Sequence, residues 1–230
     1  PTVGSLDFYG PAASNYVLQN DGSNRVITLD DDGDAPSIVA GQQSNGGNHS
    51  IQVDMEVADS SLSVSGRKLS ISGDITAMEG NNLTLNCTPN GSISFSGSND
   101  FNNGIVNVQG TGNAIFTTAG AAGGATSTVQ IHAGANAVFN AGSSVNYGTD
   151  VAFVGDGTIR TSYGSNDTNI IGSLTVRENV AAAMTGFGGG NGLQRLRIDD
   201  GESLTTETGS SLYLNGGSSL RPAIIYVSNG

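Results

Sequence analysis

The fold is decided by residues 61–101, whose sequence is SLSVSGRKLS ISGDITAMEG NNLTLNCTPN GSISFSGSND F. Four triplets in this stretch place a hydroxyl side chain between two apolar ones: Leu62-Ser63-Val64, Leu69-Ser70-Ile71, Leu83-Thr84-Leu85 and Ile93-Ser94-Phe95. Side chains alternate between the two faces of a strand, so each triplet has one apolar face and one polar face. Turn-forming Gly and Asn residues separate the triplets. Strands this short are stable only when stacked on copies of themselves, so the pattern predicts a β-solenoid.

The same pattern continues along the rest of the chain. Leu204, Leu212 and Leu220 are spaced by eight residues, and each follows a Ser in a Gly-rich turn. Elsewhere the spacing varies, which predicts coils of irregular length. The only stretch of helix-forming composition is Asn179 to Met184. We therefore predict an all-β parallel β-helix forming one domain over residues 1–230, with lead-in coils in 1–60, stacked coils in 61–220 and a terminal apolar strand in 221–230.

Composition argues against several classes of function. The chain has 230 residues, of which only 12% are charged, and its formal net charge of −12 disfavours binding to nucleic acid or to an anionic membrane surface. Apolar runs are too short to span a membrane, so we expect no membrane insertion. The single cysteine, Cys87, cannot form an intrachain disulfide and is expected to be a small buried residue. A chain that begins at Pro1 without Met suggests processing or excision, which would suit export.

Candidate ligand sites are few. Asp30-Asp31-Asp32-Gly33-Asp34 is the densest run of carboxylates, which suits Ca²⁺, although its spacing does not match an EF-hand loop. A solvated acidic turn is the alternative interpretation. His49 has no second histidine nearby in the sequence, nothing requires His49 and His132 to approach each other, and neither lies in a sequence context typical of a catalytic nucleophile. We predict no cofactor, and calcium at the acidic turn stays open.

Part of the chain resembles a known family. The best match is Ser96-Gly97-Ser98-Asn99-Asp100-Phe101, preceded by Leu69-Ser70-Ile71-Ser72-Gly73-Asp74-Ile75 and Asn82-Leu83-Thr84-Leu85, which resembles the autotransporter-associated β-strand repeat. The clear likeness covers roughly residues 3–110. One departure is Asn102-Asn103-Gly104, where the family usually has Gly-Gly-Thr. The resemblance implies a right-handed parallel β-helix, secreted by a bacterium and displayed on the cell surface as a stalk, fibre component or adhesin, with no catalytic residues.

The ends of such a stack suggest a function. No amphipathic helix that could cap either end is visible in the sequence, and an uncapped coil exposes unpaired backbone groups and an apolar cross-section. Head-to-tail stacking of copies into a filament would cover both. The expected contact residues are Leu6, Phe8, Tyr16, Ile224, Ile225, Tyr226 and Val227. The expected partner is a second copy, with a glycan or another cell-surface partner as the alternative.

An enzyme is the less favoured hypothesis. Polysaccharide lyases and hydrolases use paired carboxylates, or calcium with a basic residue, and the best candidate set is Arg195, Arg197, Asp199, Asp200 and Glu202. Because Leu196 and Ile198 alternate with the two arginines, the simpler interpretation is a strand with a polar outer face that ends in an acidic corner. Glycan binding without turnover would require an exposed aromatic ladder, for which the candidates are Tyr147, Tyr163 and Tyr213. We predict a structural protein and not an enzyme.

Overall fold

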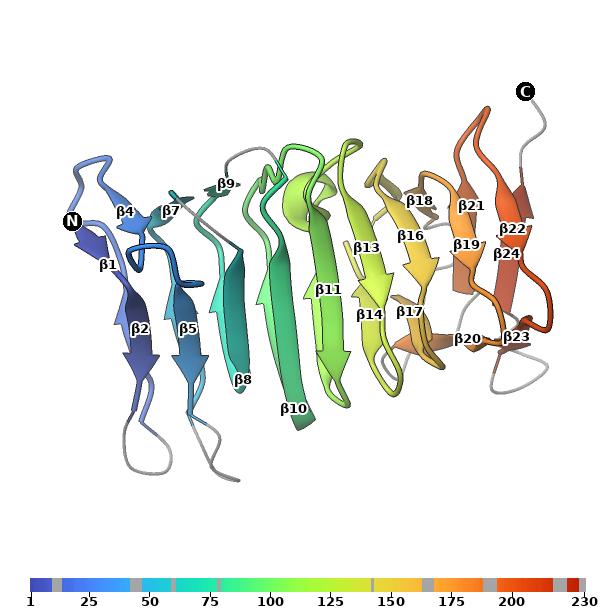
Figure 1. Ribbon diagram of the computed structural model, residues 1–230, viewed down its shortest axis with the longest axis horizontal. Coiled ribbons are helices and arrows are strands. Elements are labelled where there is room, and N and C mark those ends of the chain that lie inside the picture. Colours follow the sequence, from blue (N-terminus) through green and yellow to red (C-terminus); the bar gives the residue numbers. More distant parts are fainter. Residues whose placement is uncertain are drawn as a thin grey trace.

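The computed structural model is a parallel β-solenoid, in which successive strands stand side by side along the long axis of the molecule (Figure 1). It describes residues 1–9, 14–41, 47–58, 61–77, 80–141, 143–162, 168–187, 194–216 and 223–227. The only helix in these residues is a short 3-10 turn, η1 (Ala119–Ala122). None of the described helices is long and apolar enough to cross a membrane.

Three sides make up each coil. The first side contains β2 (Ser5–Phe8), β5 (Ser37–Ala40), β8 (Leu62–Ile71), β10 (Leu83–Phe95), β11 (Ile105–Gly110), β13 (Thr128–Ile131), β16 (Asp150–Phe153), β19 (Leu174–Val176) and β22 (Leu204–Thr206). The second side contains β3 (Val17–Leu18), β6 (His49–Ile51), β12 (Asn113–Phe116), β14 (Asn136–Phe139), β17 (Thr158–Ser162), β20 (Ala181–Phe187) and β23 (Ser211–Asn215). The long strands β8 and β10 run through both sides and join them into one 16-stranded sheet.

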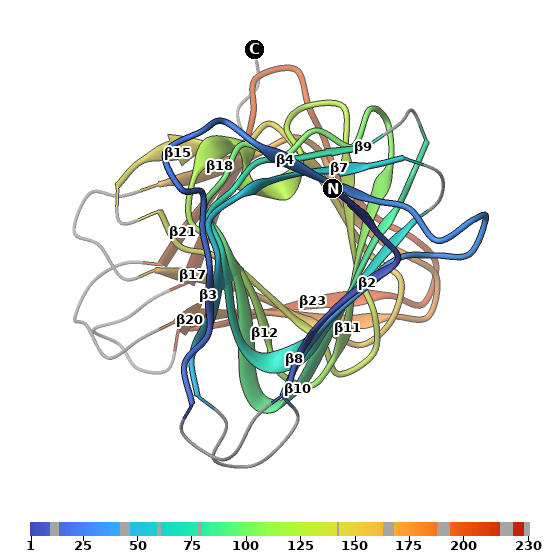
Figure 2. The same cartoon turned by 90° about the vertical axis from the view of Figure 1, so that its left-hand side faces the viewer.

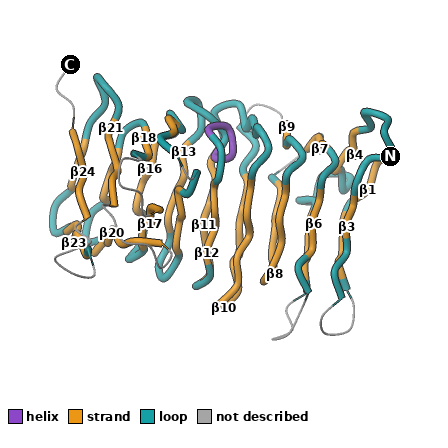
Figure 3. Tube along the Cα trace, turned by 180° about the vertical axis from the view of Figure 1, so that it is seen from behind, coloured by secondary structure: helices purple, strands orange, loops and turns teal. Residues whose placement is uncertain are grey.

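The third side consists of two shorter sheets. Nearer the N-terminus it contains β1 (Thr2–Val3), β4 (Val26–Leu29), β7 (Asp54–Val57) and β9 (Ile75–Ala77). Nearer the C-terminus it contains β15 (Val145–Asn146), β18 (Asn169–Ile171), β21 (Gln194–Ile198) and β24 (Ala223–Val227). Seen from behind, β18, β21 and β24 stand side by side at the C-terminal end (Figure 3). Pairing between neighbouring coils is parallel on all three sides.

The coil is right-handed. Viewed from the N-terminal end, the chain descends along β2, ascends along β3 and crosses the top along β4, so that it turns clockwise as it recedes (Figure 2). A right-handed crossover is the one that parallel strands of a sheet adopt almost without exception. The structure thus confirms the predicted all-β solenoid.

Inward side chains of successive coils stack in columns that form the core. In the first side, Leu83 lies opposite Leu62 of the preceding coil and Val106 of the following one, and all three are buried. In the second side, the rings of Phe95, Phe116 and Phe139 form another column, with centroid separations of 6.1 Å and 5.5 Å. Because the apolar positions alternate with polar ones, the same strands keep a hydrophilic outer surface.

The eight-residue spacing of Leu204 and Leu212 is not the length of a coil. Leu204 lies on the first side opposite Leu174, and Leu212 lies on the second side opposite Ala182, so coil partners here are 30 residues apart. A step of eight residues therefore moves the chain from one side to the next. Leu220 lies outside the described residues.

The stretch with helix-forming composition is mostly a strand. Asn179 adopts a left-handed turn conformation with φ 59°, and β20 begins two residues later. Ala182 and Met184 point into the core at every second position, opposite Leu212 and Leu214 of the next coil. Stacking on neighbouring coils therefore outweighs the helical propensity of the alanines.

The motif that carries the family resemblance forms a corner of the coil. Asn99 is buried there, and its amide group bonds to two neighbouring coils: Oδ1 accepts from Ile75 N at 3.0 Å, and Nδ2 donates to Ala121 O at 2.7 Å. The next turn has two consecutive left-handed residues, Asn102 with φ 43° and Asn103 with φ 67°. Asn tolerates this backbone better than most residues, so the departure from Gly-Gly is compatible with a tight left-handed turn.

Candidate functional site at the two ends of the solenoid

Exposed apolar surface is concentrated at the two ends of the molecule. The large hydrophobic side chains that the described residues expose are Tyr9, Tyr16, Val17 and Val26 in the first coils, and Leu204, Tyr213, Leu214, Tyr226 and Val227 on the last strands. Between Val26 and Leu204, no described residue belongs to this set. Since exposed apolar patches often mark interaction surfaces, the ends are the candidate functional site.

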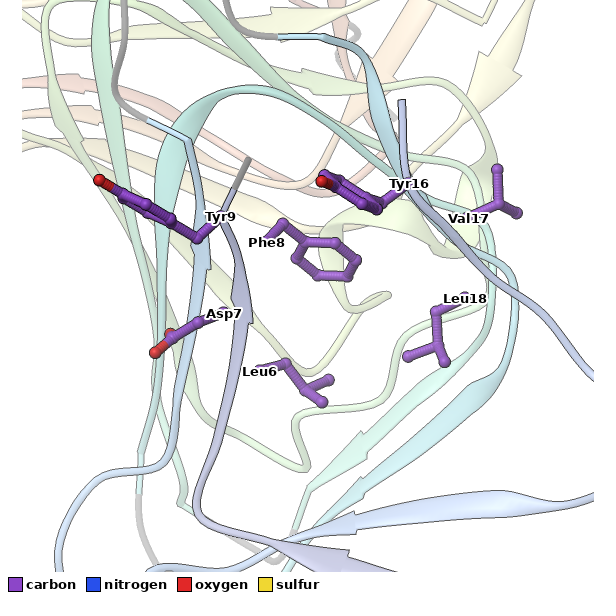
Figure 4. A pocket seen from close by; sticks show the side chains of 7 residues that line it. All are labelled: Leu6, Asp7, Phe8, Tyr9, Tyr16, Val17 and Leu18. Carbon is purple, nitrogen blue, oxygen red and sulfur yellow. The ribbon is translucent and has the colours of Figure 1, made fainter. Parts of the chain in front are cut away.

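We define the N-terminal end surface as Leu6, Phe8, Tyr9, Tyr16, Val17 and Leu18, from β2, β3 and the residues next to them; together with Asp7 they line a cavity of about 300 Å³. Figure 4 shows Leu6 and Leu18 pointing toward one another across this opening, whereas Asp7 and Tyr9 point away from it. The inward side chains Leu6, Phe8 and Leu18 pack on the core below, and among the described residues no further coil lies above them.

His49 lies directly beneath this surface. Its ring stacks against Phe8, at a centroid distance of 5.6 Å, and against Tyr16, at 5.4 Å. The imidazole is buried, and Nδ1 has no hydrogen-bond partner among the described residues. Desolvation by burial lowers the pKa of His49 below its usual value of 6.5. This histidine is therefore a neutral packing residue under the end surface, which is a poor setting for a metal ligand or a catalytic base.

We define the C-terminal end surface as Leu204, Leu212, Leu214, Ile225 and Val227, from β22, β23 and β24. With Thr206, Ser210 and Ser211 they line a second open cavity, of about 430 Å³. Leu204 is 37% exposed and Leu214 is 50% exposed, although Leu174 and Met184, their partners in the preceding coil, are buried. These side chains therefore occupy core columns at the point where the stack ends.

The residues expected from the sequence lie at both ends. Leu6, Phe8 and Tyr16 belong to the N-terminal end surface, and Ile225 and Val227 belong to the C-terminal one. Ile224 and Tyr226 lie on the opposite, outer face of β24, beside Arg195 and Arg197. The sequence did not identify Tyr9, Val17, Leu18, Leu204, Leu212 or Leu214 as end residues. Leu18, Leu204, Leu212 and Leu214 have the alternation of buried positions, whereas Tyr9 and Val17 lie on the outer face, and only the three-dimensional stack shows which strands stand at its ends.

The three acidic residues of the enzyme candidate set line a hollow on the outside of the coil, whereas Arg195 and Arg197 are not among its lining residues. Asp199, Asp200 and Glu202 line a cavity of about 470 Å³ together with Ala125, Asn146, Tyr147, Gly148, Asp150 and Gly172. As predicted, Leu196 and Ile198 are buried while the arginines face outward.

Each carboxylate of this hollow has a structural partner. Asp199 accepts from Asn146 Nδ2 at 2.8 Å, and Asp200 pairs with Arg197 at 2.7 Å. Glu202 and Asp150 both accept hydrogen bonds from Ser173, through its hydroxyl and its backbone N–H respectively. The arrangement resembles a hydrogen-bonded corner more than a free pair of acid and base groups.

The remaining candidate residues make contacts that stabilise the fold. Asp30–Asp34 forms a tight turn closed by a hydrogen bond from Asp34 N to Asp31 O. The described residues contain no group of three His, Cys, Asp or Glu side chains placed to hold a metal ion. His132 is within 3.1 Å of Asn107 on the neighbouring coil. Cys87 is fully buried, as expected, and burial raises the pKa of its thiol to about 12.

The tyrosines do not form a ladder in the described structure. Tyr147 is a core residue whose hydroxyl donates to Phe116 O at 2.9 Å, and burial raises its pKa. Tyr213 and Tyr226 are exposed but lie on different sides of the coil. Tyr163 lies outside the described residues.

Comparison with protein-family models, with curated proteins and with solved structures finds no match for this chain.

Proposed function

We propose that this protein is an extracellular structural protein, a β-solenoid building block of a bacterial surface fibre or stalk, whose copies stack head to tail. The location of the exposed apolar side chains carries this proposal: they gather at the two ends of the stack. The resemblance of residues 3–110 to the autotransporter-associated repeat supports secretion and display at the cell surface. The low content of charged residues, 12%, fits a repetitive structural role.

The ends are complementary in backbone as well as in side chains. Among the described strands, β2 and β3 at one end each pair with a single strand, β5 and β6, and β22 and β23 at the other end pair with β19 and β20. Each outer edge is therefore one to which a parallel strand of a second copy can be added. The two edges are opposite ends of the same stack, so the contact is heterologous, and repeating it produces a linear filament.

Two end-blocked variants test this proposal. Leu6→Glu places a charge on the N-terminal end surface, and Leu214→Glu places one on the C-terminal end surface. Each variant keeps one intact end, so each should be monomeric alone, while an equimolar mixture should form a dimer and nothing longer. Size-exclusion chromatography with light scattering measures the masses, and far-UV circular dichroism confirms that both variants are folded.

Asn86→Glu is the matched control, because Asn86 is exposed in the middle of the stack. It should assemble as the unmodified chain does. A mixture of the two blocked variants that stays monomeric would contradict head-to-tail stacking. Dimers formed by either blocked variant alone would instead indicate a symmetric contact between like ends.

A further inference from the structure

The junction between two copies has one vacant strand position on its third side and two strands that could fill it. We propose that β24 of one copy takes this position and displaces β1 of the next copy, so that the joint is sealed by strand exchange. This inference rests on the head-to-tail stacking proposed above. It follows from the ladders of the first and second sides, from the winding of the coil and from the lengths of the two competing strands.

The ladders of the first and second sides fix where a second copy sits. Following the pairing from coil to coil, Leu6 and Thr206 belong to one inward column of the first side. Val17 and Asn215 belong to one outward column of the second side. Continuing both columns places β2 of the second copy on β22 of the first, and β3 on β23, with the corners of the two cross-sections aligned.

The winding of the coil then leaves one place on the third side. Between the second side of one coil and the first side of the next, the chain crosses the third side once, as β4, β7 and β21 do. At the junction this crossing lies between β23 of the first copy and β2 of the second. Both β24, which follows β23, and β1, which precedes β2, belong to that same crossing.

β24 is the stronger competitor. It pairs with β21 at five residues, from Gln194 opposite Ala223 to Ile198 opposite Val227, whereas β1 pairs with β4 at only two. Its inward residues Ala223 and Ile225 already pack on the core. β1 contributes a single inward apolar side chain, Val3. In the joint, the free edge of β24 therefore pairs with β4 of the next copy, and residues 1–3 of that copy leave their place.

The register in which β24 would pair with β4 of the next copy follows from comparing β24 with β1. In each strand, the reference is the last inward residue before the chain enters the first side. That residue is Val3 in β1, and it is Val227 in β24, because Val227 is paired with Ile198 just before the chain enters the first side. The outward residues that precede them are Thr2 and Tyr226. After exchange, Tyr226 should therefore take the place of Thr2 opposite Thr28 of the next copy.

A reversible lock tests the displacement. Thr2 and Thr28 lie opposite each other on neighbouring strands, which are about 4.8 Å apart, within the range of roughly 4.4–6.8 Å that a disulfide spans. Oxidation of the Thr2→Cys, Thr28→Cys variant ties β1 in place. We expect the oxidised variant to remain monomeric in light scattering and the reduced variant to assemble as the unmodified chain does. Cys87 is buried and should not interfere.

An intermolecular cross-link tests the register. A Tyr226→Cys chain mixed with a Thr28→Cys chain should form a disulfide-linked heterodimer on oxidation. Tyr226→Cys mixed with Val26→Cys is the matched control, because a slip of two residues increases the separation to about 8 Å, beyond the reach of a disulfide. Non-reducing electrophoresis distinguishes the two mixtures.

The outcomes separate this inference from the proposed function. If the oxidised lock assembles as readily as its reduced form, or if neither pair cross-links, strand exchange is wrong while head-to-tail stacking stands. If only the control pair cross-links, β24 does lie beside β4 of the next copy but the proposed register is wrong. If the unmodified chain does not assemble at all, the proposed function fails and the exchange fails with it.

Discussion

Single side chains at the corners of the coil bond successive coils to one another. Asn99 bonds to the coil before it and to the coil after it through one amide group. Acidic residues at the same corner act similarly: Asp54 accepts from Asp74 N at 2.9 Å, and Asp74 accepts from Ser98 N at 2.6 Å. The alternation of apolar residues predicts that Asp54 faces outward, and it does, yet its carboxylate is bonded to a backbone N–H group. Periodicity indicates the face of a strand, but it does not identify the hydrogen-bond partner on the next coil.

His49 makes the N-terminal end sensitive to acid. Its pKa is lowered in the folded chain, so the unfolded chain binds the proton more readily at pH values between the folded pKa and 6.5. The free energy of unfolding should therefore be insensitive to this residue above about pH 6.5 and should fall as the pH decreases through that window. His49 and Lys68 both line a separate cavity of about 250 Å³, so Lys68 is a further positive charge nearby, and the described residues lining that cavity include no carboxylate.

His49→Phe provides the comparison, because a phenyl ring can keep the stacking contacts with Phe8 and Tyr16 without titrating. Chemical denaturation between pH 7.5 and pH 5 should show a larger loss of stability for the unmodified chain than for the variant. His132→Gln is the control and should retain the acid-dependent loss. Equal losses in the unmodified chain and His49→Phe would show that this imidazole does not cause the acid sensitivity.

At the scale of the strand, one column of the first side contains both buried and exposed positions. Leu83 is fully buried between two coils, whereas Leu204, in the same column, is 37% exposed on the last strand. Leu83→Asp buries an unpaired charge and removes a core side chain, so it should cost more than about 4 kcal/mol of unfolding free energy or prevent folding. Leu204→Asp should cost less than about 1 kcal/mol because its carboxylate reaches water.

Thermal and chemical unfolding of the two variants measure this difference. The comparison uses the same substitution at two positions of one column, so intrinsic strand propensity is matched. Equal destabilisation by the two variants would mean that the column does not end at β22. A stable, fully folded Leu83→Asp variant would contradict the inward orientation of that side of β10.

Much of the fold could be predicted from these strands, for reasons that lie in their local chemistry. The triplets around Leu62, Leu69 and Leu83 specify an apolar face, and the Gly and Asn between them specify where the chain turns. The eight-residue leucine spacing could not reveal that Leu204 and Leu212 lie on different sides, because that depends on how many residues each corner contains. Similarly, the helix-forming stretch at 179–184 is mostly a strand because neighbouring coils already fix that geometry.

At the scale of the whole molecule, the ends are where sequence analysis is least informative. An inward leucine in the last coil has the same pattern as one in the middle, so Leu204 and Leu214 could not be distinguished from core residues. Leu6, Phe8 and Tyr16 were nevertheless identified, because the expectation of an uncapped stack directs attention to its first strands.

Few charges contribute to the stability of the stack: the described residues form two ion pairs, Arg177 with Glu207 and Arg197 with Asp200, and both are solvent-accessible. Pairs of this kind typically add about 1 kcal/mol or less.

Electron microscopy of the unmodified protein across a concentration series tests the central claim most directly. Stacking through the end surfaces should produce unbranched filaments one solenoid wide, which lengthen with concentration and whose strands repeat along the axis at about 4.8 Å. Separate short rods at every concentration would contradict the claim that the two ends are the functional site of this protein.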